Sequence, residues 1–157
     1  MLVPTFIAQA DKPAPSLRCT TEYDFVGHHG VVDTEDRLLS WQGTVSGDVE
    51  GVMQWWMVMG PVTGQVTHFV DRWEIWDGEG EDANLLLAGD EAGTTTARPG
   101  KDGIWRANGI VTETSEGFED WDGRHVHDGG EFTWQVVEGP EGPLTIPEAG
   151  TGTFRIN

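Results

Sequence analysis

Apolar and polar residues alternate along much of the chain with the period of two that is typical of half-buried β-strands. The clearest alternation covers residues 17–26, 105–111 and 131–137. Further strand-like runs lie at residues 38–46, 51–59, 65–76, 84–88, 118–127 and 152–156. No window repeats apolar residues at the helical spacing over three turns, so the pattern predicts an all-β chain.

Turn signals such as Asp77-Gly78 and Gly129-Gly130 separate these runs about every 8–15 residues. Eight or more short antiparallel strands in one domain predict a closed β-barrel or a sandwich of two sheets. Closure removes the exposed strand edges that would otherwise pair with other chains. We therefore expect a closed antiparallel barrel of about eight strands over residues 17–157, with a sandwich as the alternative; the length of 157 residues fits a single domain.

Residues 1–16 differ from the rest in composition. Residues 1–10 are mostly apolar and end in Ala8-x-Ala10, which resembles the small-x-small cleavage site of a secretory signal. This interpretation predicts a secreted or periplasmic protein. A basic segment before the apolar stretch is missing, so a second interpretation stays open: an N-terminal arm that frays or packs on the barrel, with a cytoplasmic location.

The chain is strongly acidic, with a formal net charge of −18. Such a charge repels phosphate backbones, so we expect no nucleic-acid partner. No apolar run approaches the ~18 residues of a membrane-spanning helix, so we expect no membrane span. A hydrophobic fraction of 37% with eight tryptophans is nevertheless too apolar for a disordered acidic chain.

The run at residues 51–59 is apolar on both faces. Val52, Trp56 and Val58 share one face, and Trp55 lies on the other. In a barrel, only one face of a strand points inward, and large apolar patches on the outside are usually covered. We therefore expect either a homo-oligomer or an N-terminal arm packed against the outer face.

The run at residues 65–76 carries charged residues on both faces. One face holds Phe69, Asp71, Trp73 and Ile75. The other face holds His68, Val70, Arg72, Glu74 and Trp76. Whichever face points inward places charge beside aromatic rings, which is a frequent property of functional sites.

These features predict a barrel interior that binds a small apolar molecule, without a cofactor. Its expected ligand-binding residues are the tryptophans Trp55, Trp56, Trp73 and Trp105. Confinement in such a cavity suits cyclase, isomerase or lyase chemistry, although the sequence leaves open whether the protein is an enzyme. The candidates for moving protons or holding an anionic group are His68, Asp71, Arg72, Glu74 and Arg106.

A metal-dependent barrel enzyme is the main alternative. The spacing His125-x-His127-x3-Glu131 resembles the first metal motif of the cupins, which implies one divalent metal ion held by these three residues and an upstream histidine. The glycine of that motif and the second motif are missing. A polar hairpin turning at Gly129-Gly130 explains the same residues without a metal.

Three segments resemble the small barrels of the allene oxide cyclase and dirigent type. They are Trp41–Gly47 (WQGTVSG), Gly103–Val111 (GIWRANGIV) and Gly150–Arg155 (GTGTFR). The resemblance implies an eight-stranded barrel, often trimeric, with a cavity for a hydrophobic small molecule; it carries over no catalytic residue. A third interpretation is a non-enzymatic module that binds carbohydrate or a surface through exposed tryptophans.

Overall fold

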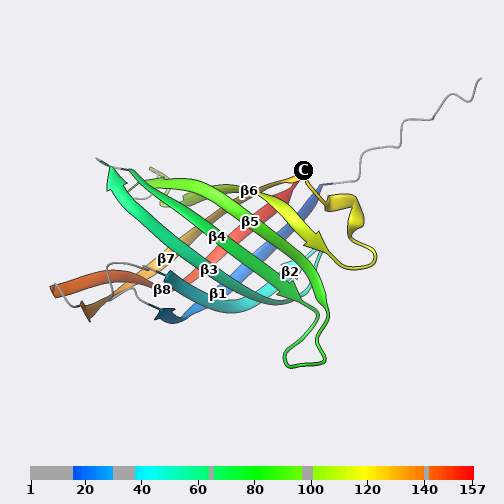
Figure 1. Cartoon of the computed structure of the whole chain (residues 1–157), viewed down its shortest axis with the longest axis horizontal. Helices are drawn as coiled ribbons and strands as arrows, with labels where there is room; N and C mark the ends of the chain where they lie inside the picture. The colour runs from blue at the N-terminus through cyan, green and yellow to red at the C-terminus, as the bar shows by residue number, and fades with distance from the viewer. Residues whose placement is uncertain (1–15, 30–37, 64–65, 97–100, 140–141) are drawn as a thin grey trace, which may run out of the picture.

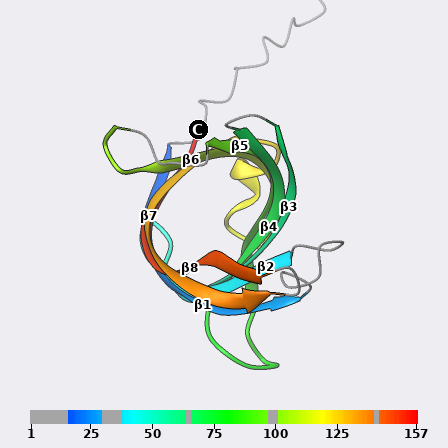
Figure 2. The ribbon, with the colours of Figure 1, turned by 90° about the vertical axis from the view of Figure 1, so that its left-hand side faces the viewer.

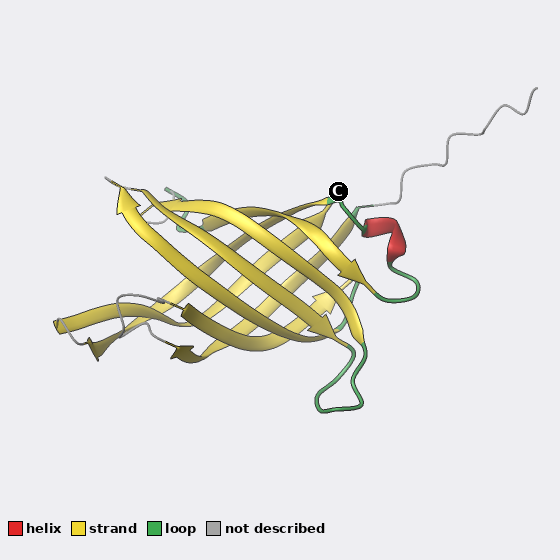
Figure 3. Cartoon of the chain, in the orientation of Figure 1, coloured by secondary structure: helices red, strands yellow, loops and turns green. Residues whose placement is uncertain are grey.

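The computed structural model describes residues 16–29, 38–63, 66–96, 101–139 and 142–157. Almost all of these residues lie in strands (Figure 3). The strands are β1 (Leu17–His29), β2 (Leu38–Gly47), β3 (Gly51–Thr63), β4 (Val66–Trp76), β5 (Leu85–Thr96), β6 (Trp105–Thr114), β7 (His125–Gly139) and β8 (Gly142–Ile156). One short 3-10 helix, η1 (Glu119–Trp121), lies between β6 and β7 (Figure 1).

The eight strands form a closed barrel in which each strand pairs antiparallel with the next along the chain. The last strand, β8, closes the ring by pairing with β1 over Leu17–Asp24 (Figure 2). The predicted all-β barrel of about eight strands is therefore confirmed, and the sandwich alternative does not apply. The proposed terminal arm lies outside the described residues except for Ser16.

Two local predictions, one of a strand and one of a turn, are wrong. The run at 118–127 is not one strand, because η1 occupies Glu119–Trp121 and β7 begins only at His125. The predicted turn at Gly129-Gly130 is absent, since both residues pair within the sheet. A Cβ at Gly130 would stand 2.6 Å from the Tyr23 hydroxyl, so this glycine makes room for a side chain rather than for a turn.

Two other strands are longer than the sequence predicted, because glycines interrupt their strand pattern. β5 continues past Ala88 to Thr96, and β8 begins at Gly142 rather than at residue 152. Both segments contain several glycines, which weaken the strand signal in the sequence. In the barrel Gly89, Gly93 and Gly150 lie against aromatic rings of neighbouring strands, and the sheet pairing continues through them.

The barrel core is densely packed at the end where η1 lies. The fully buried side chains there come from six strands and include Leu17, Ile75, Leu87, Val111, Val126 and Ile156. Phe118 and Trp121, next to and within η1, pack against this cluster and help to cover it. Along β4, this apolar layer is followed by Trp73, then Asp71, then Phe69, so the interior becomes both more aromatic and more polar away from η1.

Candidate functional site

The structure decides which face of β4 points inward. Phe69, Asp71, Trp73 and Ile75 are buried, with Asp71 only 7% exposed. The first of the two arrangements considered for this strand is therefore the observed one. It places a carboxyl group among aromatic rings in the barrel interior.

A second carboxyl group, that of Glu91 on β5, lies directly across from Asp71. The two residues are register partners, and the Glu91 side chain is 4% exposed. The Trp55 indole Nε1 donates a hydrogen bond to Asp71 Oδ2 at 2.8 Å, and Trp73 Nε1 donates to Glu91 Oε1 at 3.0 Å. The other oxygens, Asp71 Oδ1 and Glu91 Oε2, are buried and have no hydrogen-bond partner among the described residues. We refer to Asp71 and Glu91 as the carboxyl pair.

Burial strongly changes the protonation of the carboxyl pair. Desolvation raises the pKa of Asp71 to about 7, although the hydrogen bond from Trp55 works in the opposite direction. Desolvation and the nearby negative charges of Asp71 and Asp128 raise the pKa of Glu91 to about 9. Burial also raises the pKa of Asp128, on β7, to about 6. At neutral pH the carboxyl pair therefore holds at least one proton.

Aromatic rings surround Trp55 and extend the site away from the carboxyl pair. Trp41 stacks on Trp55 with ring centroids 4.4 Å apart, and Tyr23 meets Trp55 edge-on at 5.7 Å. Phe132 lies 5.4 Å from Tyr23 and 6.3 Å from Trp55. These four rings, from β1, β2, β3 and β7, form an aromatic cluster beside the carboxyl pair.

Glycines on neighbouring strands make room for the large inward side chains. A Cβ at Gly89 would lie 2.3 Å from the Trp73 ring, and a Cβ at Gly109 would lie 2.1 Å from Glu91 Cγ. No other residue type fits at these two positions without displacing Trp73 or Glu91. The positions of Trp73 and Glu91 therefore each depend on a glycine on the neighbouring strand.

Sequence reasoning missed Glu91 and Asp128. The sequence did contain a signal for Glu91. Alternate residues of a strand lie on one face, and Glu91 shares its face with Leu87, Gly89 and Gly93. The expected strand ended at residue 88, so this parity was not followed. Asp128 was treated as part of a hairpin, whereas it lies on the continuous strand β7.

Several predicted site residues lie on the outer face instead. Arg72 Nε contacts Glu74 Oε1 at 2.9 Å, and Arg72 Nη2 contacts Glu113 Oε2 at 2.8 Å. His68 is exposed on the same face. Arg106 is also exposed and pairs with Asp102. The structure thus brings together Asp71, Trp55 and Trp73 among the predicted residues, and leaves the predicted cationic residues outside the interior.

The remaining tryptophans of the predicted site, Trp56 and Trp105, are half-buried. Trp56 follows Trp55 on β3 and lies on the outer face with Val58, which is 42% exposed. No described residues test the predicted cover of this face by an arm or a second copy of the chain, so that expectation stays a prediction.

The three predicted metal ligands share the outer face of β7. His125, His127 and Glu131 are all exposed, and His127 Nδ1 lies 2.8 Å from Asn108 Oδ1. Within the described ranges, no group of three or more His, Cys, Asp or Glu side chains is arranged to hold a metal ion. Of the three upstream histidines, His28 and His29 have side chains outside the described part, and His68 is exposed on β4. The metal site stays a prediction without geometric support.

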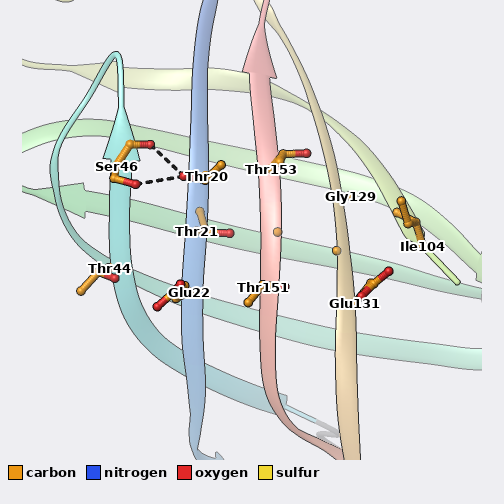
Figure 4. Close-up of a pocket in the computed structure, with 12 residues that line it drawn as sticks. Thr20, Thr21, Glu22, Thr44, Ser46, Ile104, Gly129, Glu131, Thr151 and Thr153 are labelled. Carbon is orange, nitrogen blue, oxygen red and sulfur yellow. Dashed lines mark hydrogen bonds between the residues drawn. The ribbon is translucent and has the colours of Figure 1, made fainter.

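A polar groove of about 560 Å³ crosses the outer faces of β2, β1, β8 and β7 (Figure 4). Thr20 and Ser46 share a hydrogen bond of 2.9 Å along its wall. The other residues lining it include Glu22, Thr44, Ile104, Glu131, Thr151 and Thr153. No tryptophan lines it, so it does not match the predicted carbohydrate platform of exposed aromatic rings.

Comparison with family models, with curated proteins and with solved structures finds no match for this chain. In the part of the chain that the structure describes, no helix is long and apolar enough to cross a bilayer. The function must accordingly be argued from the geometry of the site.

Proposed function

We propose that the protein binds a small, largely apolar molecule in the barrel interior, between the carboxyl pair and the aromatic cluster. One observation carries this proposal: Asp71 and Glu91 are register partners, and Asp71 Oδ1 and Glu91 Oε2 are each buried without a hydrogen-bond partner among the described residues. A buried polar atom without a partner costs about 1–3 kcal/mol. A ligand that donates hydrogen bonds to these two oxygens would recover that free energy.

The aromatic cluster supplies the apolar part of the proposed site. Ligand sites are usually apolar and aromatic, with a few polar groups that orient the molecule. Trp55 belongs to both parts, since its ring stacks on Trp41 and its N–H holds Asp71. Binding in a barrel cavity is also what the resemblance to the allene oxide cyclase and dirigent type implies.

Turnover, where it occurs, would use the carboxyl pair as acid and base. With a pKa of about 7 for Asp71 and about 9 for Glu91, the first is mostly ionised and the second mostly protonated at pH 8. A base and an acid side by side can take a proton from one atom of a ligand and return it to another. This is the chemistry of isomerases, cyclases and lyases, which the sequence already favoured.

A neutral fluorescent probe, N-phenyl-1-naphthylamine, tests the proposed binding. We expect saturable one-to-one binding with energy transfer from tryptophan to the probe. Trp55→Phe should reduce the affinity about threefold to tenfold, because it removes both a ring contact and the donor that orients Asp71. The matched control is Trp56→Phe, the next residue on β3, whose ring lies on the outer face.

Two results would contradict the proposal. The first is the absence of saturable binding by folded protein. The second is binding that survives Trp55→Phe but is lost in Trp56→Phe, which would locate the probe on the outer surface. Far-ultraviolet circular dichroism and urea denaturation of each variant separate loss of binding from loss of folding.

A further inference from the structure

The acidic groups of the barrel interior have no basic partner among the described residues. Asp71 and Glu91 are buried, and Asp128 contributes a third negative group that acts on both. Every described Lys, Arg and His side chain is at least partly exposed: Arg18, His68, Arg72, Lys101, Arg106, Arg124, His125, His127 and Arg155. Buried carboxylates are normally paired with a cation, and the described residues supply none to these interior acids.

The carboxyl pair can reach one shared ligand group. Asp71 and Glu91 are direct cross-strand neighbours, and such side chains begin about 5 Å apart. Each has one oxygen that an indole holds and one oxygen that is free. A protonated amine offers up to three N–H donors from one atom, whereas a hydroxyl group offers a single donor. An ammonium group can therefore satisfy both free oxygens and also cancel charge.

The aromatic cluster suits the apolar part of such a ligand. Trp55 connects the cluster to the carboxyl pair, because its N–H bonds Asp71 while its ring stacks on Trp41. A ligand whose ammonium group binds the free oxygens would thus have aromatic rings near enough to contact its apolar part.

We infer that the ligand of the barrel interior carries a positively charged nitrogen, which binds between Asp71 Oδ1 and Glu91 Oε2 while its apolar part contacts the aromatic cluster. This inference rests on the proposed function and narrows the ligand to the class of apolar amines. A purely apolar molecule, the class expected from the sequence, would leave both free oxygens unpaired.

Binding of a cation there is coupled to proton release. Near pH 8 the Glu91 carboxyl is mostly protonated in the free protein, and a bound ammonium group favours its ionised form. The other titratable groups on the described inner surface are Asp128 on β7, with a raised pKa, and Tyr23 on β1, whose raised pKa keeps it neutral at this pH. Cys19 on β1 lies in the packed apolar core, and its thiol contacts Val49 O. Glu91 is therefore the main source of the released proton.

The test compares probes that share an apolar part and differ in charge. Three series suffice: hexyl, decyl and phenethyl compounds, each as the amine, the alcohol and the carboxylate. Titrations at pH 8 follow tryptophan fluorescence, and calorimetry in phosphate and in Tris counts protons from the difference in apparent enthalpy. In at least one series we expect the amine to bind at least about tenfold tighter than the alcohol, the carboxylate to bind weakest, and about one proton to be released per amine.

Two isosteric variants separate the site from the general negative charge of the protein. Glu91→Gln should reduce the preference for amine over alcohol to less than about threefold and abolish proton release, while the alcohol still binds. Asp90→Asn removes the same charge from the neighbouring residue on β5, which is exposed on the outer face. This control should keep the preference.

The outcomes distinguish this inference from the proposed function. If the alcohols bind as tightly as the amines, the charged-ligand inference is wrong and interior binding stands. If Asp90→Asn lowers the preference as much as Glu91→Gln, the cation binds through the overall charge and the inference is again wrong. If no member of the three series binds, the proposed function itself is contradicted.

Discussion

The inner and outer faces of the β4–β5 strand pair both carry acidic residues, but in the described part of the chain a cation contacts only those on the outer face. Outside, the Arg72 guanidinium contacts Glu74 at 2.9 Å and Glu113 at 2.8 Å, with Asp90 farther away at 3.5 Å. Inside, Asp71 and Glu91 are register partners, and among the described residues their hydrogen-bond donors are the indole N–H groups of Trp55 and Trp73. Successive side chains of a strand point to opposite faces, so Asp71 points inward and the next residue, Arg72, points outward.

The two faces differ in what their acids contribute to stability. The outer acids are partly solvated and lie near a guanidinium, so each ion pair contributes up to about 1 kcal/mol. The inner acids are desolvated and have no counter-charge among the described residues, so their neutral forms are favoured. The outer cluster is therefore a modest structural contact, and the inner pair is the place where we propose that a ligand binds.

The largest expected effect on stability comes from filling the space that Glu91, one member of the carboxyl pair, occupies. Gly109→Val would place a Cβ 2.1 Å from Glu91 Cγ and 2.8 Å from Glu91 Cα. Because backbone as well as side chain must move, we expect the free energy of unfolding to fall by at least about 3 kcal/mol, measured by urea denaturation.

The adjacent residue provides the matched control for that prediction. Ile110 points outward on β6 and is 45% exposed, so Ile110→Val should change the free energy of unfolding by less than about 1 kcal/mol. Equal effects of the two substitutions would show that the inner face is no more tightly packed than the outer one.

The next effect is a difference in pH dependence between the faces. The folded pKa of Glu91, about 9, lies above its ordinary value of about 4.3, so the native state binds more protons than the unfolded state between these values. The free energy of unfolding should therefore fall as pH rises through this range and level off above pH 9. Glu91→Gln removes this titration, so the variant should gain on the order of 3 kcal/mol relative to the parent between pH 5 and pH 8.

An outer acid should show no such gain. Asp90→Asn removes an exposed carboxylate from the same strand, and its stability should follow the parent across this pH range within about 0.5 kcal/mol. Parallel stability curves for the parent and Glu91→Gln would mean that Glu91 titrates normally, and the contrast between the two faces would then be lost.

The barrel fold, and the grouping of Asp71 with the other residues on its face of β4, could be predicted from the sequence. The period-two alternation and the frequent turn signals were sufficient for a closed all-β barrel. The parity of residues 65–76 placed Asp71 with Phe69 and Trp73, but parity cannot say which face turns inward, because both faces mixed charged and apolar residues. That choice depends on how eight strands close, which is a property of the whole chain.

The position of Glu91, the second member of the carboxyl pair, could not be predicted, because glycines interrupt the pattern around it. Glu91 lies in a segment whose glycines, Gly89 and Gly93, resemble turn signals, although in the fold they make room for Trp73 and Phe69 on β4. A local pattern cannot separate these two uses, since the deciding neighbours are distant in sequence: Gly109 accommodates Glu91 across β5 and β6. For the same reason Gly129-Gly130 suggested a hairpin and concealed the inward position of Asp128.

The smallest expected effect concerns the outer cluster. Arg72→Gln leaves Glu74 and Glu113 without their guanidinium, but the three side chains are partly exposed and water can solvate them. We expect the free energy of unfolding to fall by about 1 kcal/mol or less at low ionic strength, and by still less in 1 M NaCl, because salt screens exposed charges. The pH dependence that Glu91 produces should be unchanged, since burial and the charges of Asp71 and Asp128 raise the pKa of Glu91, and Arg72 does not contribute. A loss of about 3 kcal/mol, or a shifted pH profile, would show instead that Arg72 acts on the carboxyl pair through the sheet, and that the two faces titrate as one system.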